Sequence, residues 1–314
     1  METKNDKLGA LVIGATGKLG SLITKHCLQK PNLQVSIFIR NPEKDPELVN
    51  QVEKAGGKVI KGDLSQPETI KGCTKGMHTV ISVVSHMSTQ VRLDGQIALV
   101  KDCMENGVSR FVPTDFAGDF TKFSDEELAR SLVAETKVKL RKYLETVPIK
   151  TLHFWPGFFM ETFFDAQHHG FSYWDHDDQR YDLTSYEDTA KVVASAVSNP
   201  DKTGDIYFVG DDLSIREVNE IYNKVRGTTN IKQKRLGSLD DLKKKHDEIK
   251  NNESDFFFAH ALGLFSMMYD DRSKFHSNNN ADFPDIKFTT FEEFLKQNPD
   301  VKVPEDVVKT LNIS

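Results

Sequence analysis

Short runs of apolar residues alternate with amphipathic stretches in the first half of the chain. The apolar runs lie at residues 10–13, 35–39, 58–60, 80–84, 110–112 and 151–154. Their apolar character is continuous, which is typical of strands in a parallel sheet that helices cover on both faces. Between them, residues 19–29 and 96–105 repeat apolar positions with the 3.6-residue period of a helix. The pattern predicts an α/β fold built on a doubly wound parallel Rossmann sheet, whose ligand cleft lies at the carboxyl ends of the strands.

The second half of the chain has a less regular pattern. Nine aromatic residues, with both tryptophans among them, fall between positions 154 and 174. A helix over about 187–197 and a strand near 206–209 are predicted to return to the sheet, and helices with polar connections are predicted from 213 onward. We therefore expect a Rossmann domain at 1–155, completed by about 186–209, and a second, smaller, mostly helical domain at 156–185 and 210–314.

Composition and charge narrow the class of protein. The chain has 314 residues, 38% of them hydrophobic and 28% charged, and its 41 basic and 47 acidic residues give a net charge of −6. We expect a globular protein without a nucleic-acid or membrane partner. The first ten residues are polar and no apolar run reaches the length of a membrane span. The three cysteines are widely spaced and odd in number, so the protein is expected to be cytoplasmic with reduced thiols.

The most specific motif directly follows the first predicted strand. Its residues are Gly14, Ala15, Thr16, Gly17, Lys18, Leu19 and Gly20. Glycines at this spacing permit a tight turn, a close approach of the backbone to a pyrophosphate, and close packing of the following helix. The positive amino end of that helix then faces the phosphates. An ordinary strand-to-helix turn is the alternative, but the preceding strand and the following amphipathic helix favour a dinucleotide site.

The residue after the second predicted strand indicates which dinucleotide is bound. An NAD site usually has an acidic residue there, whereas this chain has Arg40. A guanidinium can bind a 2′-phosphate with two hydrogen bonds, so NADPH is favoured over NADH unless Arg40 is only a solvated surface residue. Lys18 could add a second positive charge near the same phosphate. After the third predicted strand, Asp63, followed by Leu64, either accepts a hydrogen bond from adenine or caps a helix that begins after Ser65.

A lysine occupies the apolar stripe of a helix predicted over about 125–145. Lys137 is in register with Val133, Leu140 and Leu144. Burial of a lysine lowers its pKa and favours general acid–base chemistry, unless the ammonium extends from the edge of the stripe into solvent. Arg141 and Glu145 are expected to form an (i, i+4) pair.

Other constellations are weaker. The histidines and aspartates between 168 and 178 could hold a metal ion, but such loops are usually solvated, and we expect no metal. His153 is predicted to be a core histidine with a satisfied hydrogen bond. The aromatic cluster is interpreted as an apolar substrate cleft, with an ordinary core or a homodimer interface as alternatives. No serine or cysteine has a base at nucleophile spacing, which argues against a hydrolase.

Several motifs, taken in order, resemble the NmrA-like, isoflavone-reductase-like branch of the atypical short-chain dehydrogenases. Besides the glycine turn and Arg40, they are GDL (62–64), RFVPTDFAGD (110–119), KVKLRKYLE (137–145), PGFF (156–159), DLTSYEDTAKVVA (182–194) and GDDLSIREVNEIYNKVRG (210–227). The resemblance implies an NADPH-binding sheet domain and a substrate-binding domain.

The resemblance also implies roles for particular residues. Lys137, four positions before Arg141, would be the group that transfers a proton. The segment with Pro113, Thr114 and Phe116 would border the nicotinamide, with Gly157 and Phe158 on the other side of the ring. The Tyr-x-x-x-Lys pattern of the wider superfamily is absent, since Val133 stands where the tyrosine would be.

These features together predict an NADPH-dependent reductase. Hydride would pass to a carbonyl or an activated double bond of an apolar small molecule, with Lys137 as proton donor. The alternative is a protein that binds NADP(H) without turning it over and reports redox state to a partner. Plant reductases of this type have PSEFG where this chain has PTDFAGD, and their substrate loops have no match here. A plant-type phenylpropanoid substrate is therefore not predicted.

Overall fold

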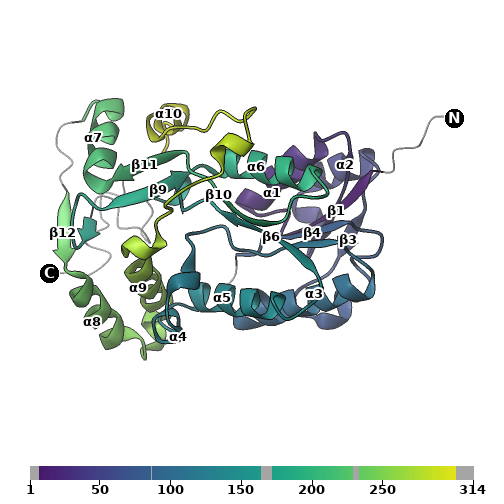
Figure 1. Cartoon of the computed structure of the whole chain (residues 1–314), viewed down its shortest axis with the longest axis horizontal. Coiled ribbons are helices and arrows are strands. Elements are labelled where there is room, and N and C mark those ends of the chain that lie inside the picture. The colour runs from purple at the N-terminus through teal and green to yellow at the C-terminus, as the bar shows by residue number, and fades with distance from the viewer. Residues whose placement is uncertain (1–6, 86, 164–171, 229–232, 302–314) are drawn as a thin grey trace. The chain divides into compact units, whose positions relative to one another are not determined.

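Figure 1 shows a computed structural model of the chain, which describes residues 7–85, 87–163, 172–228 and 233–301. The chain forms two compact units. The first consists of Met1–Asp115, Thr136–Phe154 and Thr189–Ile206, and the second of Phe116–Glu135, Trp155–Asp188 and Tyr207–Ser314. Residues 116–135, predicted to lie in the Rossmann domain, thus group with the second unit.

A seven-stranded sheet with the order β10-β6-β5-β4-β1-β2-β3 forms the centre of the first unit. Its strands are β1 (Leu8–Ile13), β2 (Leu33–Ile39), β3 (Val59–Lys61), β4 (Thr79–Ser82), β5 (Arg110–Val112), β6 (Lys150–Trp155) and β10 (Gly204–Tyr207). The pairs from β3 through β6 are parallel. The strand order reverses between β1 and β4, where a doubly wound sheet binds its ligand. The predicted fold class is confirmed.

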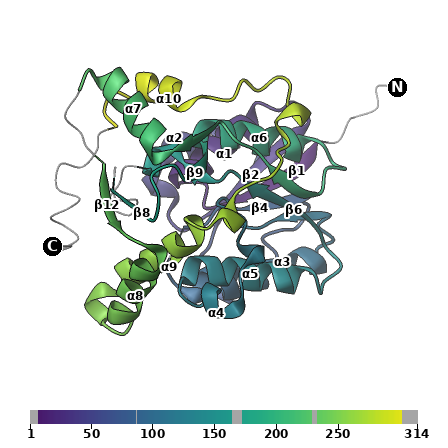
Figure 2. The same ribbon diagram turned by 60° about the vertical axis from the view of Figure 1, so that its left-hand side comes forward.

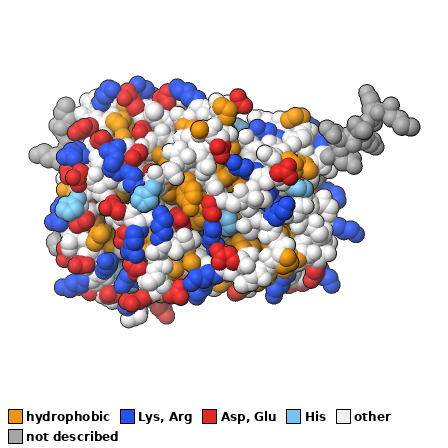
Figure 3. All heavy atoms as spheres, viewed as in Figure 1, with side chains coloured by type: hydrophobic (Ala, Val, Ile, Leu, Met, Phe, Trp, Pro, Cys, Tyr) orange, Lys and Arg blue, Asp and Glu red, His pale blue; other side chains and the backbone are white. Residues whose placement is uncertain are grey.

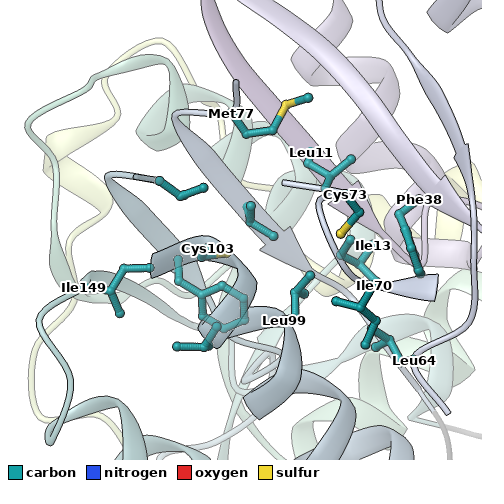
Figure 4. Packing of buried hydrophobic residues seen from close by; sticks show 14 of the residues in the cluster. Leu11, Ile13, Phe38, Leu64, Ile70, Cys73, Met77, Leu99, Cys103 and Ile149 are labelled. Atoms are coloured by element: carbon teal, nitrogen blue, oxygen red, sulfur yellow. The ribbon is translucent and has the colours of Figure 1, made fainter. Parts of the chain in front are cut away.

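Helices cover both faces of this sheet (Figures 1 and 2). On one face are α1 (Lys18–Leu28), α2 (Pro46–Lys54) and α6 (Tyr186–Ser198), and on the other are α3 (Gln96–Glu105) and α5 (Leu132–Leu144). Leu11 and Ile13 of β1 pack in one buried cluster with Leu99 and Cys103 of α3 (Figure 4). Since the alternate residues of β1 are also buried, the continuous apolar run is explained by cover on both faces.

The three cysteines are buried and free, as expected for reduced thiols. Burial raises the pKa of Cys27 and of Cys73 to about 12. The thiols are therefore small apolar core groups rather than nucleophiles.

The helix predicted over 125–145 is interrupted, and this prediction is wrong. It is divided into α4 (Asp125–Leu128) and α5, with a turn between them. A helix of the second unit, α9 (Phe256–Met268), lies directly against this turn, since a Cβ at Gly263 would lie 2.0 Å from the carbonyl oxygen of Arg130. His260 of α9 accepts a hydrogen bond from the N–H of Leu132 at 3.2 Å and so caps the second helix.

The second unit contains two small sheets besides its helices. One has the order β11-β9-β7 and the other the order β12-β8. Their strands are β7 (Phe158–Phe159), β8 (Ser172–Trp174), β9 (Arg180–Thr184), β11 (Asp211–Ser214) and β12 (Lys234–Gly237); the remaining helices are α7 (Ile215–Arg226), α8 (Leu239–Ile249) and α10 (Phe291–Gln297). The unit is similar in size to the first.

Figure 3 shows basic and acidic side chains interspersed over one face of the molecule, as expected when 41 basic and 47 acidic residues nearly balance. Within the described part of the chain, no helix is both long and apolar enough to span a membrane.

Candidate active site

The glycine motif forms a tight turn between β1 and α1. Gly14 has a φ of 80°, and a Cβ at Gly20 would lie 2.1 Å from the Gly14 carbonyl oxygen. Inside the turn, the N–H of Gly17 donates to the same carbonyl at 3.0 Å. Side chains at positions 14 and 20 would therefore prevent the turn from closing.

The amino end of α1 is open to an anion. Gly17 is the N-cap and supplies no side-chain hydrogen bond, and the first turn contains no acidic residue. Thr16, Gly17 and Lys18 are exposed, whereas Leu19 is buried against the sheet. Uncapped N–H groups and the positive end of the helix dipole make this end suitable for a pyrophosphate.

Arg40 and Asp63 lie beyond the carboxyl ends of β2 and β3. Arg40 is exposed, so its guanidinium is accessible to a ligand. Asp63 Oδ1 accepts hydrogen bonds from both the N–H and the hydroxyl of Ser65, each at 2.9 Å. The short helix that follows, Pro67–Thr69, has no side-chain cap, so the alternative in which Asp63 caps a helix is wrong. Leu64 is buried beside it.

Lys137 is buried, as its place on the apolar stripe predicts. Its side chain does not extend into solvent: Nζ donates a hydrogen bond to the carbonyl oxygen of Thr114 at 2.7 Å. Thr114 lies just beyond β5, and its hydroxyl donates to the Val84 carbonyl beyond β4 at 3.0 Å. The Lys137 amine thus lies at the carboxyl ends of β4 and β5, on one side of the switch point between β4 and β1.

The pKa of Lys137 is lowered to about 7. Burial is the main cause, and the positive charge of Arg92 adds to it, while the negative charge of Asp115 opposes it. An amine with a pKa near neutrality can both give and take a proton, which suits a general acid or base.

A buried carboxylate and histidine lie next to Thr114 and were not predicted as a pair. Asp115 Oδ2 is 2.6 Å from Nδ1 of His153, and both side chains are almost fully buried. His153 thus has the satisfied hydrogen bond predicted for a core histidine. The N–H of Asp115 donates to the carbonyl of Pro113 at 2.9 Å, which turns the chain tightly after β5.

Arg141 makes the predicted pair with Glu145 at 3.5 Å. It also makes two hydrogen bonds with the Asp205 carboxylate, at 2.6 and 3.1 Å, which sequence analysis did not find. Because Asp205 lies on β10, this bidentate pair fastens α5 to the edge strand of the sheet. Helical spacing in the sequence reveals Glu145 as a partner of Arg141, but not Asp205, which is 64 residues away.

Phe116, Gly157 and Phe158 belong to the second unit. Phe116 has a φ of 33°, unusual for a residue with a bulky side chain. At Gly157, with a φ of 71°, a Cβ would lie 2.3 Å from the Asp182 carbonyl oxygen, so glycine is required. Gly157 and Phe158 line a small pocket in this unit with Tyr181, Asp182 and Met268.

Among the described residues, no group of three or more histidine, cysteine, aspartate or glutamate side chains is arranged to hold a metal ion. His168 and His169 lie outside the described residues, so the expectation of no metal stays a prediction.

Comparison with known sequences identifies the family. The NmrA-like family matches residues 6–295. A phenylcoumaran benzylic ether reductase of Betula pendula is 23% identical over 317 residues, covering 91% of this chain and 97% of the relative. An isoflavone reductase homolog of Solanum tuberosum is 24% identical and covers 91% and 97%.

Comparison with solved structures supports the same fold. Crystal structures of pinoresinol-lariciresinol and phenylcoumaran benzylic ether reductases include one that matches with a TM-score of 0.76 at 18% identity, over 93% of this chain and 99% of the other. A leucoanthocyanidin reductase–NADPH complex from Vitis vinifera matches with a TM-score of 0.73 at 18% identity, over 93% and 100%. The chain therefore belongs to the NmrA-like family, and the relatives that match most of its length are named as reductases or reductase homologs.

Proposed function

We propose that this protein is an NADPH-dependent reductase in which Lys137 donates the proton that accompanies hydride transfer. The acceptor would be a carbonyl or an activated double bond in an apolar small molecule. The observation that carries the proposal is the buried Lys137 amine, bonded to the Thr114 carbonyl at 2.7 Å at the carboxyl edge of the sheet.

The cofactor is NADP(H), and the residues of the first unit fit it. The Gly14–Gly20 turn closes because residues 14 and 20 carry no side chains that would meet the backbone. The uncapped amino end of α1, which starts within this turn, suits a pyrophosphate. Arg40 and Lys18, both exposed, would hold the 2′-phosphate. The remaining proposed contacts are Thr16, Gly17 and Leu19 at the pyrophosphate, Asp63 and Leu64 near adenine, and Pro113, Thr114, Phe116, Lys137, Gly157 and Phe158 around the nicotinamide.

When bound, NADPH supplies the hydride, and the chain supplies orientation and a proton. As the substrate gains hydride, negative charge develops on its oxygen or enolate, and the Lys137 ammonium donates a proton to it, directly or through water. With a pKa of about 7, Lys137 is protonated in a large fraction of molecules near neutral pH.

An apolar substrate is supported by the aromatic side chains of the second unit. Phe158 makes edge contacts with Phe163 and Tyr181, at ring-centroid distances of 6.3 and 5.3 Å. Phe158 and Tyr181 line the pocket of that unit. A related solved protein, AtPrR2, contains NADP+ and (+)-pinoresinol, which is a precedent for an aromatic ligand in this fold.

The test is NADPH oxidation by the purified protein with a panel of aldehydes, ketones and enones. We expect Lys137→Met, which keeps the aliphatic stem, to lower kcat by roughly 100-fold or more while NADPH still binds. Lys142→Ala is the matched control, because Lys142 is an exposed lysine on the same helix. Parent activity should fall as pH rises above about 7, because the donor is then deprotonated.

Two results would contradict the proposal. Equal turnover by the parent and Lys137→Met would leave a reductase with another proton donor. Tight NADPH binding without turnover of any compound would instead favour the protein that only reports redox state.

A further inference from the structure

A π-helical turn, Gln90–Gly95, leads into α3, and two polar side chains of this continuous segment are buried. Arg92 is 5% exposed, and Gln96, the first residue of α3, is 1% exposed. Turns of this type are rare and are often found at functional sites. Gly95 lets the turn approach the chain after β3, since a Cβ there would lie 2.5 Å from the Leu64 carbonyl oxygen.

Hydrogen bonds from this turn form a closed ring through Lys137. Lys137 Nζ donates to the Thr114 carbonyl at 2.7 Å, and the Thr114 N–H donates to Oε1 of Gln96 at 3.3 Å. Nε2 of Gln96 donates to the Arg92 carbonyl. Nε of Arg92 donates to the Thr136 hydroxyl at 3.1 Å, and Thr136 is covalently joined to Lys137.

We propose that Arg92 and Gln96 are positioning residues that fix the Lys137 amine against Thr114, and that the Arg92 guanidinium supplies a positive charge beside it. This inference rests on the proposed role of Lys137 as proton donor. The ring holds the backbone next to Lys137, through Thr136, and also holds the Thr114 segment whose carbonyl accepts the hydrogen bond of the amine. Because the Lys137 side chain is already ordered, it loses little conformational entropy when a substrate binds.

Three charged or titratable groups set the electrostatics of the amine. Arg92 on the π-helical turn repels a second positive charge, and Asp115 after β5 attracts one. Asp115 is itself paired with His153 of β6 at 2.6 Å. Arg92 therefore favours release of the Lys137 proton, while Asp115 limits how far the pKa falls.

The experiment is titration of the Lys137 side chain by NMR in full-length protein with ¹³C-labelled lysine, its resonance being assigned by its loss in Lys137→Met. The parent midpoint should lie near 7. In Arg92→Met, which removes the charge, we expect a midpoint roughly one unit or more higher. Arg92→Lys, which keeps the charge, should restore a low midpoint.

Arg110→Met is the matched control. Arg110 is as deeply buried as Arg92, but it lies at the amino end of β5 and donates to the carbonyls of Val197, Asn199 and Lys202. Loss of this charge should lower stability and leave the Lys137 midpoint where it is. In turnover, Arg92→Met should lower kcat roughly tenfold with little change in KM, and shift the high-pH limb upward.

Gln96→Leu is a second test that breaks the ring without altering charge and covers the case in which Arg92→Met does not fold. It should lower kcat and shift the midpoint less than the loss of Arg92 does. The inference is overturned if the Lys137 midpoint of the parent lies near the ordinary lysine pKa. It is also overturned if Arg92→Met and Arg110→Met shift that midpoint equally, or if Gln96→Leu changes neither kcat nor the midpoint. A midpoint that moves as expected, in a protein whose turnover survives Lys137→Met, supports the positioning and rejects the proton donor.

Discussion

At the scale of single residues, Lys137 is costly to the fold. Burial of an ammonium is unfavourable, and its lowered pKa records that cost. The Thr114 carbonyl compensates only in part, with one hydrogen bond. A buried charged residue lowers the stability of the fold, yet here hydrogen bonds from neighbouring residues keep it in one position. This combination is typical of a functional site.

The stability of the protein should therefore increase when the amine is removed. We expect Lys137→Met to raise the free energy of unfolding on the order of a few kcal/mol at pH 6, measured by urea denaturation. The folded protein releases the Lys137 proton near pH 7, and the unfolded chain near pH 10.4. Between these values the unfolded state binds the extra proton, so the parent gains stability as pH rises and the advantage of the variant shrinks. Lys142→Ala should have no such pH-dependent effect.

Arg40 determines which dinucleotide is preferred. A guanidinium on a phosphate makes charge-assisted hydrogen bonds worth about 1.5–3 kcal/mol. Arg40→Ala should thus raise the Kd for NADPH roughly 10- to 100-fold and leave the Kd for NADH almost unchanged, as measured by fluorescence titration. Arg40→Lys should restore part of the difference. Equal losses for both cofactors would show that Arg40 does not contact the 2′-phosphate.

At the scale of elements, the parallel sheet could be predicted because its signal is local. The central strands β1, β2, β4, β5 and β6 are mostly runs of buried residues, and such a run is visible without knowledge of its neighbours. The edge strand β3 is only partly buried. The turn after β1 could be predicted because glycine spacing is itself a local signal: Gly20 is required by its contact with the Gly14 carbonyl, six residues earlier. Gly14 is required by its φ of 80° and also by a contact with the Val83 carbonyl, which the spacing does not reveal.

The interrupted helix could not be predicted, because its cause lies far away in the sequence. The periodicity of 125–145 continues through the break, and the partners at the turn are Gly263 and His260, more than 100 residues later. The small strands of the second unit were not predicted for a related reason. They are two to five residues long and pair with segments distant in sequence, so no alternation has room to develop.

For the candidate site, the sequence predicted individual residues but not the contacts between them. The stripe on α5 indicates Lys137, but its partners Thr114, Gln96 and Arg92 come from two other segments of the chain. A hydrogen bond between side chain and distant backbone leaves no pattern in the sequence. The buried Asp115–His153 pair could not be predicted either, because its two side chains are 38 residues apart in the sequence.

At the scale of the whole molecule, the chain passes repeatedly between the two units, and each unit is assembled from three segments. A ligand that binds one unit can thus be distinguished from a ligand that binds both by the amides it protects. The Rossmann sheet and its glycine turn lie in the first unit, whereas Phe116, Gly157 and Phe158 lie in the second.

Hydrogen exchange with and without NADPH tests this division. We expect NADPH to slow exchange at 14–20 and 62–64 in the first unit. At 100 times its Kd, amides that exchange only by unfolding of that unit should slow about 100-fold. If the nicotinamide contacts are assigned correctly, 113–116 and 157–158 are protected too, while α7 and α10 exchange as before. Protection at the glycine turn alone would remove Phe116, Gly157 and Phe158 from the cofactor site, because a ligand slows the amides it contacts whichever unit they belong to.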